Sequence, residues 1–366
     1  MTRIPYVNLA IQWQQERDHL LPIVENILEG GQYIGSKEVD NFEKKFATYC
    51  HRKYCIGVSS GTDAIFIALR SLGIGPGDEV ITTSLSWIAT ANAISMTGAN
   101  PVFCDIDNDL NINIESLKKM ISEKTKAILP VHYTGRACNI DAISEISTKY
   151  RIPVVYDAAQ SFGSTYNQKP IGMYGDLSCF SMNPMKTLGA LGEAGCIFTD
   201  DKELYEYIKV LRYNGTINKD LCVTKGLNGR LDSLQAAFLV DRLALLNDKI
   251  DKIKSICAHY NYLLNDIVSI PKLDSSISSS CYYSYTIQVE NRDDLSKYLL
   301  KNGVETKVQH PILMCDQKPY LNSRSDKITN AREIVNKILC LPANEKITKS
   351  EVEYISNLIV KFQKNS

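Results

Sequence analysis

The sequence predicts an α/β protein in which a large domain, built on a mainly parallel sheet covered by helices, precedes a smaller α+β domain. One observation is that short apolar runs alternate with helical patterns through most of the chain, which is typical of parallel sheets with helices on both faces. The other is length, because 366 residues exceed the roughly 250 to 300 at which a single core stops growing. We expect the large domain to span residues 1–247 and the small domain residues 248–366.

The first expected unit is a helix over 38–50 followed by a strand that begins at Cys55. This strand passes through Gly61 and Thr62 into a helix over 64–72. Backbone N–H groups at the start of a helix favour a phosphate group, glycine allows its close approach, and the Thr62 hydroxyl adds a donor. An ordinary helix cap by serine or threonine explains the same residues equally well, so both interpretations stay open.

The next strand, over 79–83, leads to Trp87 and a helix that ends near Thr97. Ligands of open α/β sheets bind at the carboxyl ends of the strands, so the Trp87 ring is placed to stack on a flat ligand. Packing in the core is the alternative role for this side chain. The alternation continues with strands over 101–106 and 127–132 and a helix over 139–149.

A further apolar strand, over 153–157, ends in Asp157. A carboxylate just past a buried strand is costly unless it meets a positive charge, so Asp157 predicts a cationic partner. The alternative is that Asp157 caps a helix.

Lys186 lies among small and apolar residues in a loop that precedes a strand over 195–199. A setting that excludes water lowers the pKa of an amine and frees its lone pair for Schiff-base chemistry. Local composition alone fits a surface lysine at least as well.

Helical patterns follow from Lys202 and break at residues 213–215. They resume at Asp232 as a long stretch into the 260s, which we expect to link the two domains. The small domain is then expected to contain a strand over 284–290 and helices over 293–301, 327–338 and 349–362.

Composition narrows the class of partner. Forty-one basic residues balance forty-one acidic ones, so no net charge favours nucleic acid or an anionic membrane. The eleven cysteines are scattered without a C-x-x-C pair, which predicts neither a disulfide framework nor a metal site. The N-terminus lacks the pattern of a signal peptide, and the uncharged run over 80–104 contains too many polar residues for a membrane helix. We expect a cytoplasmic protein that binds a small, specific ligand.

The candidate residues match one cofactor when they are taken together. Lys186 is suited to hold an aldehyde as a Schiff base, and Asp157 to keep a pyridine nitrogen protonated. Trp87 is suited to stack on the ring, and the helix start at Gly61 and Thr62 to bind a phosphate. These are the requirements of pyridoxal 5′-phosphate.

Nearly the whole chain resembles the DegT/StrS-type nucleotide-sugar aminotransferases, a family of fold-type I pyridoxal-phosphate enzymes. The resemblance is carried by an ordered series of segments, which are GGQYIGSKEVDNFEKKFATYC, VSSGTDAIFIALRSLGIGPGDEVITTSLSWIATANAI, VHYTGRACNIDAI, VVYDAAQSFGS, FSMNPMKTLGALGEAG and GLNGRLDSLQAAFL.

The resemblance implies a role for each matching residue. Lys186 is the covalent attachment point and catalytic residue, and Asp157 pairs with the protonated ring nitrogen. Gln160 contacts the ring hydroxyl and Trp87 stacks on the ring. Gly61, Thr62 and Ser181 hold the phosphate. Asn228 reaches the phosphate of the partner subunit, which implies a homodimer with shared active sites.

The resemblance also implies the reaction, which is transfer of an amino group from L-glutamate to the keto group of a nucleotide-linked deoxysugar. The product would enter a surface polysaccharide such as the O-antigen of lipopolysaccharide, or another glycoside. Residues 305–311, ETKVQHP, align without a gap to the form E-T-K-I-H-Y-P, which favours C3 of a dTDP-3-keto-6-deoxyhexose. Amination at C4 of a 4-keto-6-deoxyhexose is the alternative.

In this segment Gln309 and His310 replace the usual His-Tyr pair. Lys307 and His310 are candidates to contact the nucleotide diphosphate or the hexose; an exposed loop lysine and a packing histidine explain them as well. A regulator that binds the cofactor without turnover is an alternative of another class. A dehydratase is disfavoured, since related sugar dehydratases carry histidine in place of Lys186.

Overall fold

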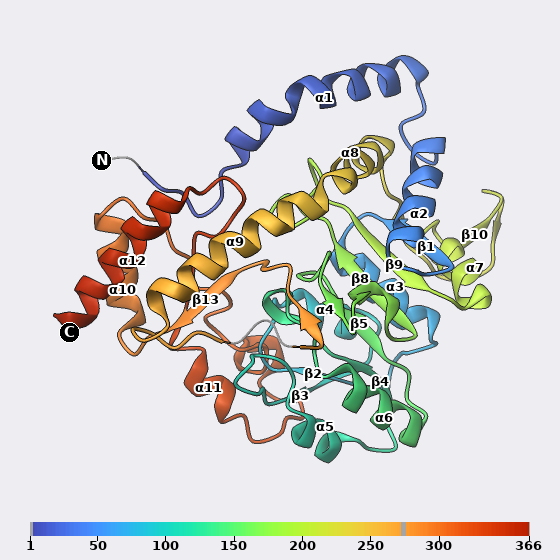
Figure 1. Ribbon diagram of the computed structural model, residues 1–366. Coiled ribbons are helices and arrows are strands. Elements are labelled where there is room, and N and C mark those ends of the chain that lie inside the picture. The colour runs from blue at the N-terminus through green and yellow to red at the C-terminus, as the bar shows by residue number, and fades with distance from the viewer. Residues whose placement is uncertain (1–2, 272–275, 366) are drawn as a thin grey trace.

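The computed structural model describes residues 3–271 and 276–365. Its centre is a sheet with the strand order β1-β9-β8-β5-β4-β2-β3, in which single bridges from residue 128 to 154 and from 131 to 157 join β4 to β5 (Figure 1). The strands are β1 (Tyr54–Val58), β2 (Glu79–Thr83), β3 (Asn100–Cys104), β4 (Thr125–Leu129), β5 (Val155–Asp157), β8 (Leu177–Ser181) and β9 (Gly195–Thr199).

All of these strands run in one direction except β9, which is antiparallel to both of its neighbours. The mainly parallel sheet predicted from the sequence is therefore confirmed. The carboxyl ends of β1, β5 and β8 consequently lie along the same edge of the sheet, and this edge is where α/β proteins bind ligands.

Helices cover both faces of the sheet. Side chains alternate along each strand, so Phe180 packs into one core while its neighbour Cys179 packs into the other. Three helices cover the face on which Cys179 packs, namely α3 (Gly61–Ser71), α4 (Ala89–Met96) and α7 (Lys202–Leu211). The opposite face is covered by α2 (Lys37–Tyr49), α5 (Ile114–Met120), α6 (Ile140–Tyr150) and α8 (Ser233–Ala244).

The expected long linking helix is two helices, α8 and α9 (Leu246–Leu264), that meet at Leu245. Figure 1 shows α9 crossing from α8 to the C-terminal elements. These elements enclose a separate core and are β13 (Tyr285–Gln288), α10 (Arg292–Lys301), β14 (Ile338–Leu341) and α12 (Lys349–Lys364).

The helix predicted over 327–338 is wrong in part. Only α11 (Asn330–Ile334) is helical, and Ile338 begins strand β14, which pairs antiparallel with β13. All four residues of β14 are buried and apolar. Periodicity cannot distinguish such a short apolar run from a helical turn.

Helix α1 (Leu9–Gly30) was not predicted, and its N-terminal neighbour Ile4 packs in the core of the C-terminal elements. The division at residue 247 stays a prediction. The N-terminal residue Ile4 contributes to the core formed by the C-terminal elements, so the two predicted domains share packing. Short elements complete the described fold, namely β6 (Thr165–Tyr166), β7 (Lys169–Pro170), β10 (Thr216–Ile217), β11 (Leu221–Cys222) and β12 (Ser278–Ser279).

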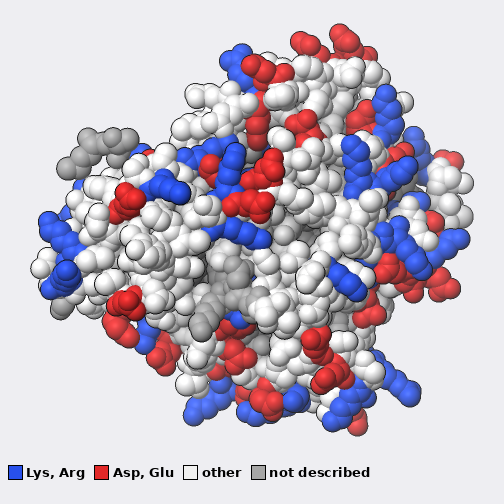
Figure 2. Space-filling view, in the orientation of Figure 1, with Lys and Arg blue, Asp and Glu red and all other residues white. Residues whose placement is uncertain are grey.

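Acidic and basic side chains are interspersed over the face shown in Figure 2. None of the helices formed by residues 3–271 and 276–365 combines the length and apolarity needed to cross a membrane.

Candidate active site

A cavity of about 440 Å³ lies at the carboxyl edge of the sheet. It brings together the predicted site residues Gly61, Thr62, Trp87, Asp157, Gln160, Ser181, Lys186, Lys307 and His310. Asn228 lies elsewhere, in a second cavity of about 360 Å³ beside Ser59 and Arg230. Glu193 lines both cavities, so the two are neighbours.

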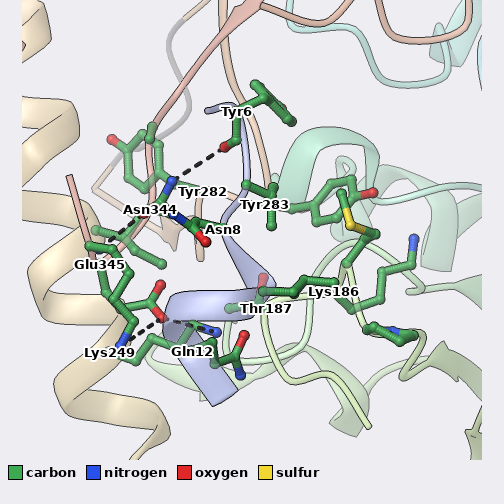
Figure 3. A pocket seen from close by; sticks show the side chains of 17 residues that line it. Tyr6, Asn8, Gln12, Lys186, Thr187, Lys249, Tyr282, Tyr283, Asn344 and Glu345 are labelled. Carbon is green, nitrogen blue, oxygen red and sulfur yellow. Dashed lines mark hydrogen bonds and ion pairs between the residues drawn. The ribbon is translucent and has the colours of Figure 1, made fainter. Parts of the chain in front are cut away.

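Lys186 lies in the loop between β8 and β9, and hydrogen bonds within the loop fix its course. The Lys186 N–H donates to the Asn183 carbonyl at 2.9 Å, and the Ala190 N–H donates to the Met182 carbonyl at 2.7 Å. The lysine amine lies 4.6 Å from the centre of the Tyr283 ring (Figure 3).

Burial lowers the pKa of Lys186 to about 8, with the Asp157 charge opposing this shift and the Lys307 charge adding to it. An appreciable fraction of the amine is therefore neutral near pH 7. Since only the neutral amine is a nucleophile, the surface-lysine interpretation gives way to a reactive one.

Asp157 is the last residue of β5 and is 4% exposed. Its Oδ2 accepts a hydrogen bond from the Thr90 hydroxyl at 2.7 Å, and its Oδ1 accepts one from the Ala159 N–H at 3.1 Å. Burial raises its pKa, while these two hydrogen bonds and the Lys186 charge oppose the shift. No helix begins in the described stretch 158–164, so the helix-cap interpretation is wrong. A buried carboxylate of this kind suits a cationic ring nitrogen.

Ser60, Gly61 and Thr62, at the start of α3, all line the cavity. Ser60 is the capping residue, because its hydroxyl oxygen accepts a hydrogen bond from the Asp63 N–H at 3.1 Å. Gly61 and Thr62 therefore supply the first N–H groups of the helix beside the cavity. A Cβ atom at Gly61 would lie only 2.5 Å from the Cβ of Ser181, so glycine is required for this close approach. The arrangement fits a phosphate group.

Trp87 is 61% exposed, which excludes the alternative of packing in the core of the described chain. Its ring centre lies 5.8 Å from that of His310. The Nδ1 atom of His310 is 3.1 Å from the Tyr133 hydroxyl, and burial together with the Lys186 and Lys307 charges lowers the His310 pKa to about 3. His310 is therefore neutral at physiological pH.

Thr90 and Tyr283 are among the cavity residues that sequence reasoning missed, and both contact predicted site residues. Thr90 follows Trp87 by three residues, and this helical spacing could have suggested that both face one site. Tyr283 belongs to a run of tyrosines without a motif, and only the tertiary fold brings it to Lys186.

A mainly parallel sheet that presents a lysine of lowered pKa, a buried aspartate and an open helix start around one cavity defines a pyridoxal-phosphate enzyme. The model of the DegT/DnrJ/EryC1/StrS aminotransferase family matches residues 14–360, and the chain belongs to this family. It is an aminotransferase that depends on pyridoxal 5′-phosphate, as the sequence predicted.

The dTDP-3-amino-3,6-dideoxy-alpha-D-galactopyranose transaminase of Aneurinibacillus thermoaerophilus is 36% identical and covers 98% of this chain and 99% of its own. The UDP-2-acetamido-2-deoxy-3-oxo-D-glucuronate aminotransferase of Pseudomonas aeruginosa is 34% identical, with 96% and 98% covered. The crystal structure of NtdA from Bacillus subtilis with bound cofactor PMP has a TM-score of 0.92 and 29% identity, and covers 100% of this chain and 86% of its own.

Proposed function

We propose that this enzyme transfers the amino group of L-glutamate to C3 of a dTDP-linked 3-keto-6-deoxyhexose. The observation that carries the proposal is the single cavity in which Lys186 and Asp157 face Lys307 and His310. Two relatives support the sugar class, since one is named for a dTDP-3-amino-dideoxy sugar and the other for a UDP-linked 3-oxo sugar. The product would enter a surface polysaccharide such as an O-antigen, or another glycoside, and the reaction would take place in the cytoplasm.

The cofactor, when bound, supplies an electron sink for the carbon that loses a proton. We assign its phosphate to Gly61, Thr62 and Ser181, and its ring nitrogen to Asp157, whose carboxylate is held by Thr90. The ring oxygen is assigned to Gln160 and the ring face to Trp87.

Lys186 is assigned two tasks. It would hold the cofactor covalently at rest, and its amine, once free, would accept and return the proton of the Cα of glutamate. A pKa of about 8 suits this exchange, because the amine can both accept and release a proton near neutral pH.

Lys307 and His310 are assigned to the sugar nucleotide. The exposed Lys307 ammonium is suited to the diphosphate. We assign to the neutral His310 the tautomer in which Nδ1 accepts from the Tyr133 hydroxyl and Nε2 carries the proton, and this N–H is suited to a sugar oxygen.

The proposed position of amination is tested with matched 3-keto and 4-keto dTDP-6-deoxyhexoses and glutamate. We expect a higher kcat/KM for the 3-keto sugar by roughly 10-fold or more, because a few contacts contribute about 1 to 3 kcal/mol to selectivity. Lys186→Ala serves as the background control. A preference for the 4-keto sugar would exclude the C3 assignment and leave the aminotransferase standing.

We also propose a homodimer with shared sites, because Asn228 lies outside the cavity of its own chain and accepts a hydrogen bond from Arg230 at 3.1 Å. A two-fold interface would bring Asn228 to the phosphate of the partner subunit.

Mixing inactive Lys186→Ala with a severely impaired Asn228→Leu should then restore activity in hybrid dimers that have one intact site. The matched control is Lys186→Ala mixed with Asp157→Asn, whose changes both lie in the cavity of their own chain, so that every site of the hybrid carries one change and no recovery is expected. Absence of recovery after demonstrated subunit exchange contradicts sharing.

A further inference from the structure

A buried line of polar side chains ends at Gln160, which lines the cavity. Gln309 contacts Gln160 but is not itself part of the cavity wall, and Ser284 contacts Gln309 in turn. The exposed fractions are 5% for Gln160, 3% for Gln309 and 2% for Ser284. Polar groups buried this deeply are costly unless they are hydrogen-bonded, so their arrangement is closely specified.

The direction of each hydrogen bond follows from the backbone of Thr134. Its N–H donates to Oε1 of Gln160 at 2.8 Å, and because a backbone N–H can only donate, the amide oxygen of Gln160 must occupy this position. Gln309 then has to present its own donor, and its Nε2 donates to the same oxygen at 3.5 Å. The remaining oxygen of Gln309 accepts from the Ser284 hydroxyl at 3.0 Å.

This arrangement leaves Gln160 with only its NH₂ group to offer to a ligand. An NH₂ group donates and cannot accept, so the matching ligand atom is an acceptor. The ring oxygen of pyridoxal phosphate is such an atom, and its negative charge strengthens the hydrogen bond.

We propose that Gln309 is a positioning residue that holds the Gln160 amide so that its NH₂ donates to the ring oxygen of the cofactor. The inference rests on the proposed contact of Gln160 with that oxygen. Thr134 and Gln309 both donate to the amide oxygen, so Gln309 adds a second restraint on the orientation of the Gln160 amide. Gln309, which stands where the related segment carries histidine, therefore presents a neutral donor to the Gln160 oxygen.

The test is the absorbance of the holoenzyme against pH without substrate, where the band of the Lys186-bound cofactor reports protonation of the linking nitrogen. A donor to the ring oxygen stabilises its negative charge and so lowers the proton affinity of that nitrogen. Gln160→Leu should raise the midpoint by roughly one pH unit, and Gln309→Leu by roughly half a unit, in keeping with the loss of one hydrogen bond and the loosening of another.

Two further variants separate positioning from general disruption. In the Gln160→Leu background, Gln309→Leu should add no shift, because Gln309 acts only through Gln160. Gln309→His, which keeps a ring N–H donor, should restore the wild-type midpoint.

An unchanged midpoint in Gln309→Leu overturns the proposal. The proposal is also overturned if Gln309→Leu shifts the midpoint of the Gln160→Leu variant by as much as it shifts that of the wild type. If Gln309→Leu fails to fold, Gln309→Met, which has a similar length and no donor, replaces it in both comparisons. An error in the proposed sugar leaves this measurement untouched, because no sugar is present.

Discussion

The two walls of the cavity are built differently. On one wall, Asp157 and Lys186 follow strands of the central sheet, and neighbouring hydrogen bonds fix their positions. On the other, Lys307 and His310 belong to segment 305–311, which is joined to β14 by a bridge at Lys307 and holds His310 in a left-handed backbone conformation, with φ of 53°. The comparison teaches that the cavity joins residues positioned by the sheet to residues carried on a short segment, and our proposal assigns the cofactor to the first wall and the sugar nucleotide to the second.

The largest expected effect comes from the sheet wall. Lys186→Ala should lower turnover by about 10⁴-fold or more while the fold stays intact, because we propose that this one residue is both nucleophile and proton carrier. The matched control is Lys307→Ala, which removes an amine from the opposite wall and should change KM much more than kcat. Steady-state kinetics and thermal unfolding of both variants make the comparison. Appreciable turnover by Lys186→Ala without added amine would contradict the role of the sheet wall.

Asp157→Asn should have the next largest effect and slow the half-reaction with glutamate by several orders of magnitude. A neutral amide cannot hold the positive charge of the ring nitrogen, so the cofactor becomes a poorer electron sink. Stopped-flow absorbance measures the half-reaction directly. Thr90→Val, which removes one hydrogen bond from the same carboxylate, should produce a much smaller loss. An unchanged rate in Asp157→Asn would show that another group keeps the ring protonated.

The same contrast explains what could be predicted from the sequence. Strands β2 and β9 have the expected bounds because compact apolar runs specify them, and Asp157 and Lys186 stand out because each follows such a strand. Tyr283 meets Lys186 only through the tertiary fold, which no local pattern encodes.

Helix α1 gave little signal, since only Leu20 and Ile27 of its residues are buried and Pro22 interrupts its pattern. The role that we propose for Asn228 depends on a partner subunit, and neither the sequence pattern nor the cavity of one chain specifies that contact.

The smallest expected effect is on stability and concerns the charge of Lys186 in the cofactor-free protein. The pKa of Lys186 is about 8, compared with an ordinary value of 10.5. Between these two pH values the unfolded chain binds more protons than the folded chain, so stability rises with pH through this window, and below pH 8 the full penalty for burying the charge remains.

Lys186→Met should therefore stabilise the cofactor-free protein at pH 7 by about 1 to 3 kcal/mol, and this gain should shrink toward zero by about pH 10.5. Lys307→Met, on the exposed wall, should change stability by less than about 0.5 kcal/mol, because an exposed charge keeps its hydration. Denaturant unfolding of the three proteins at pH 7 and pH 10 measures both differences. If Lys186→Met gained the same stability at both pH values, the gain would instead reflect apolar packing of the methionine. The difference between the buried and the exposed lysine would then have no electrostatic basis.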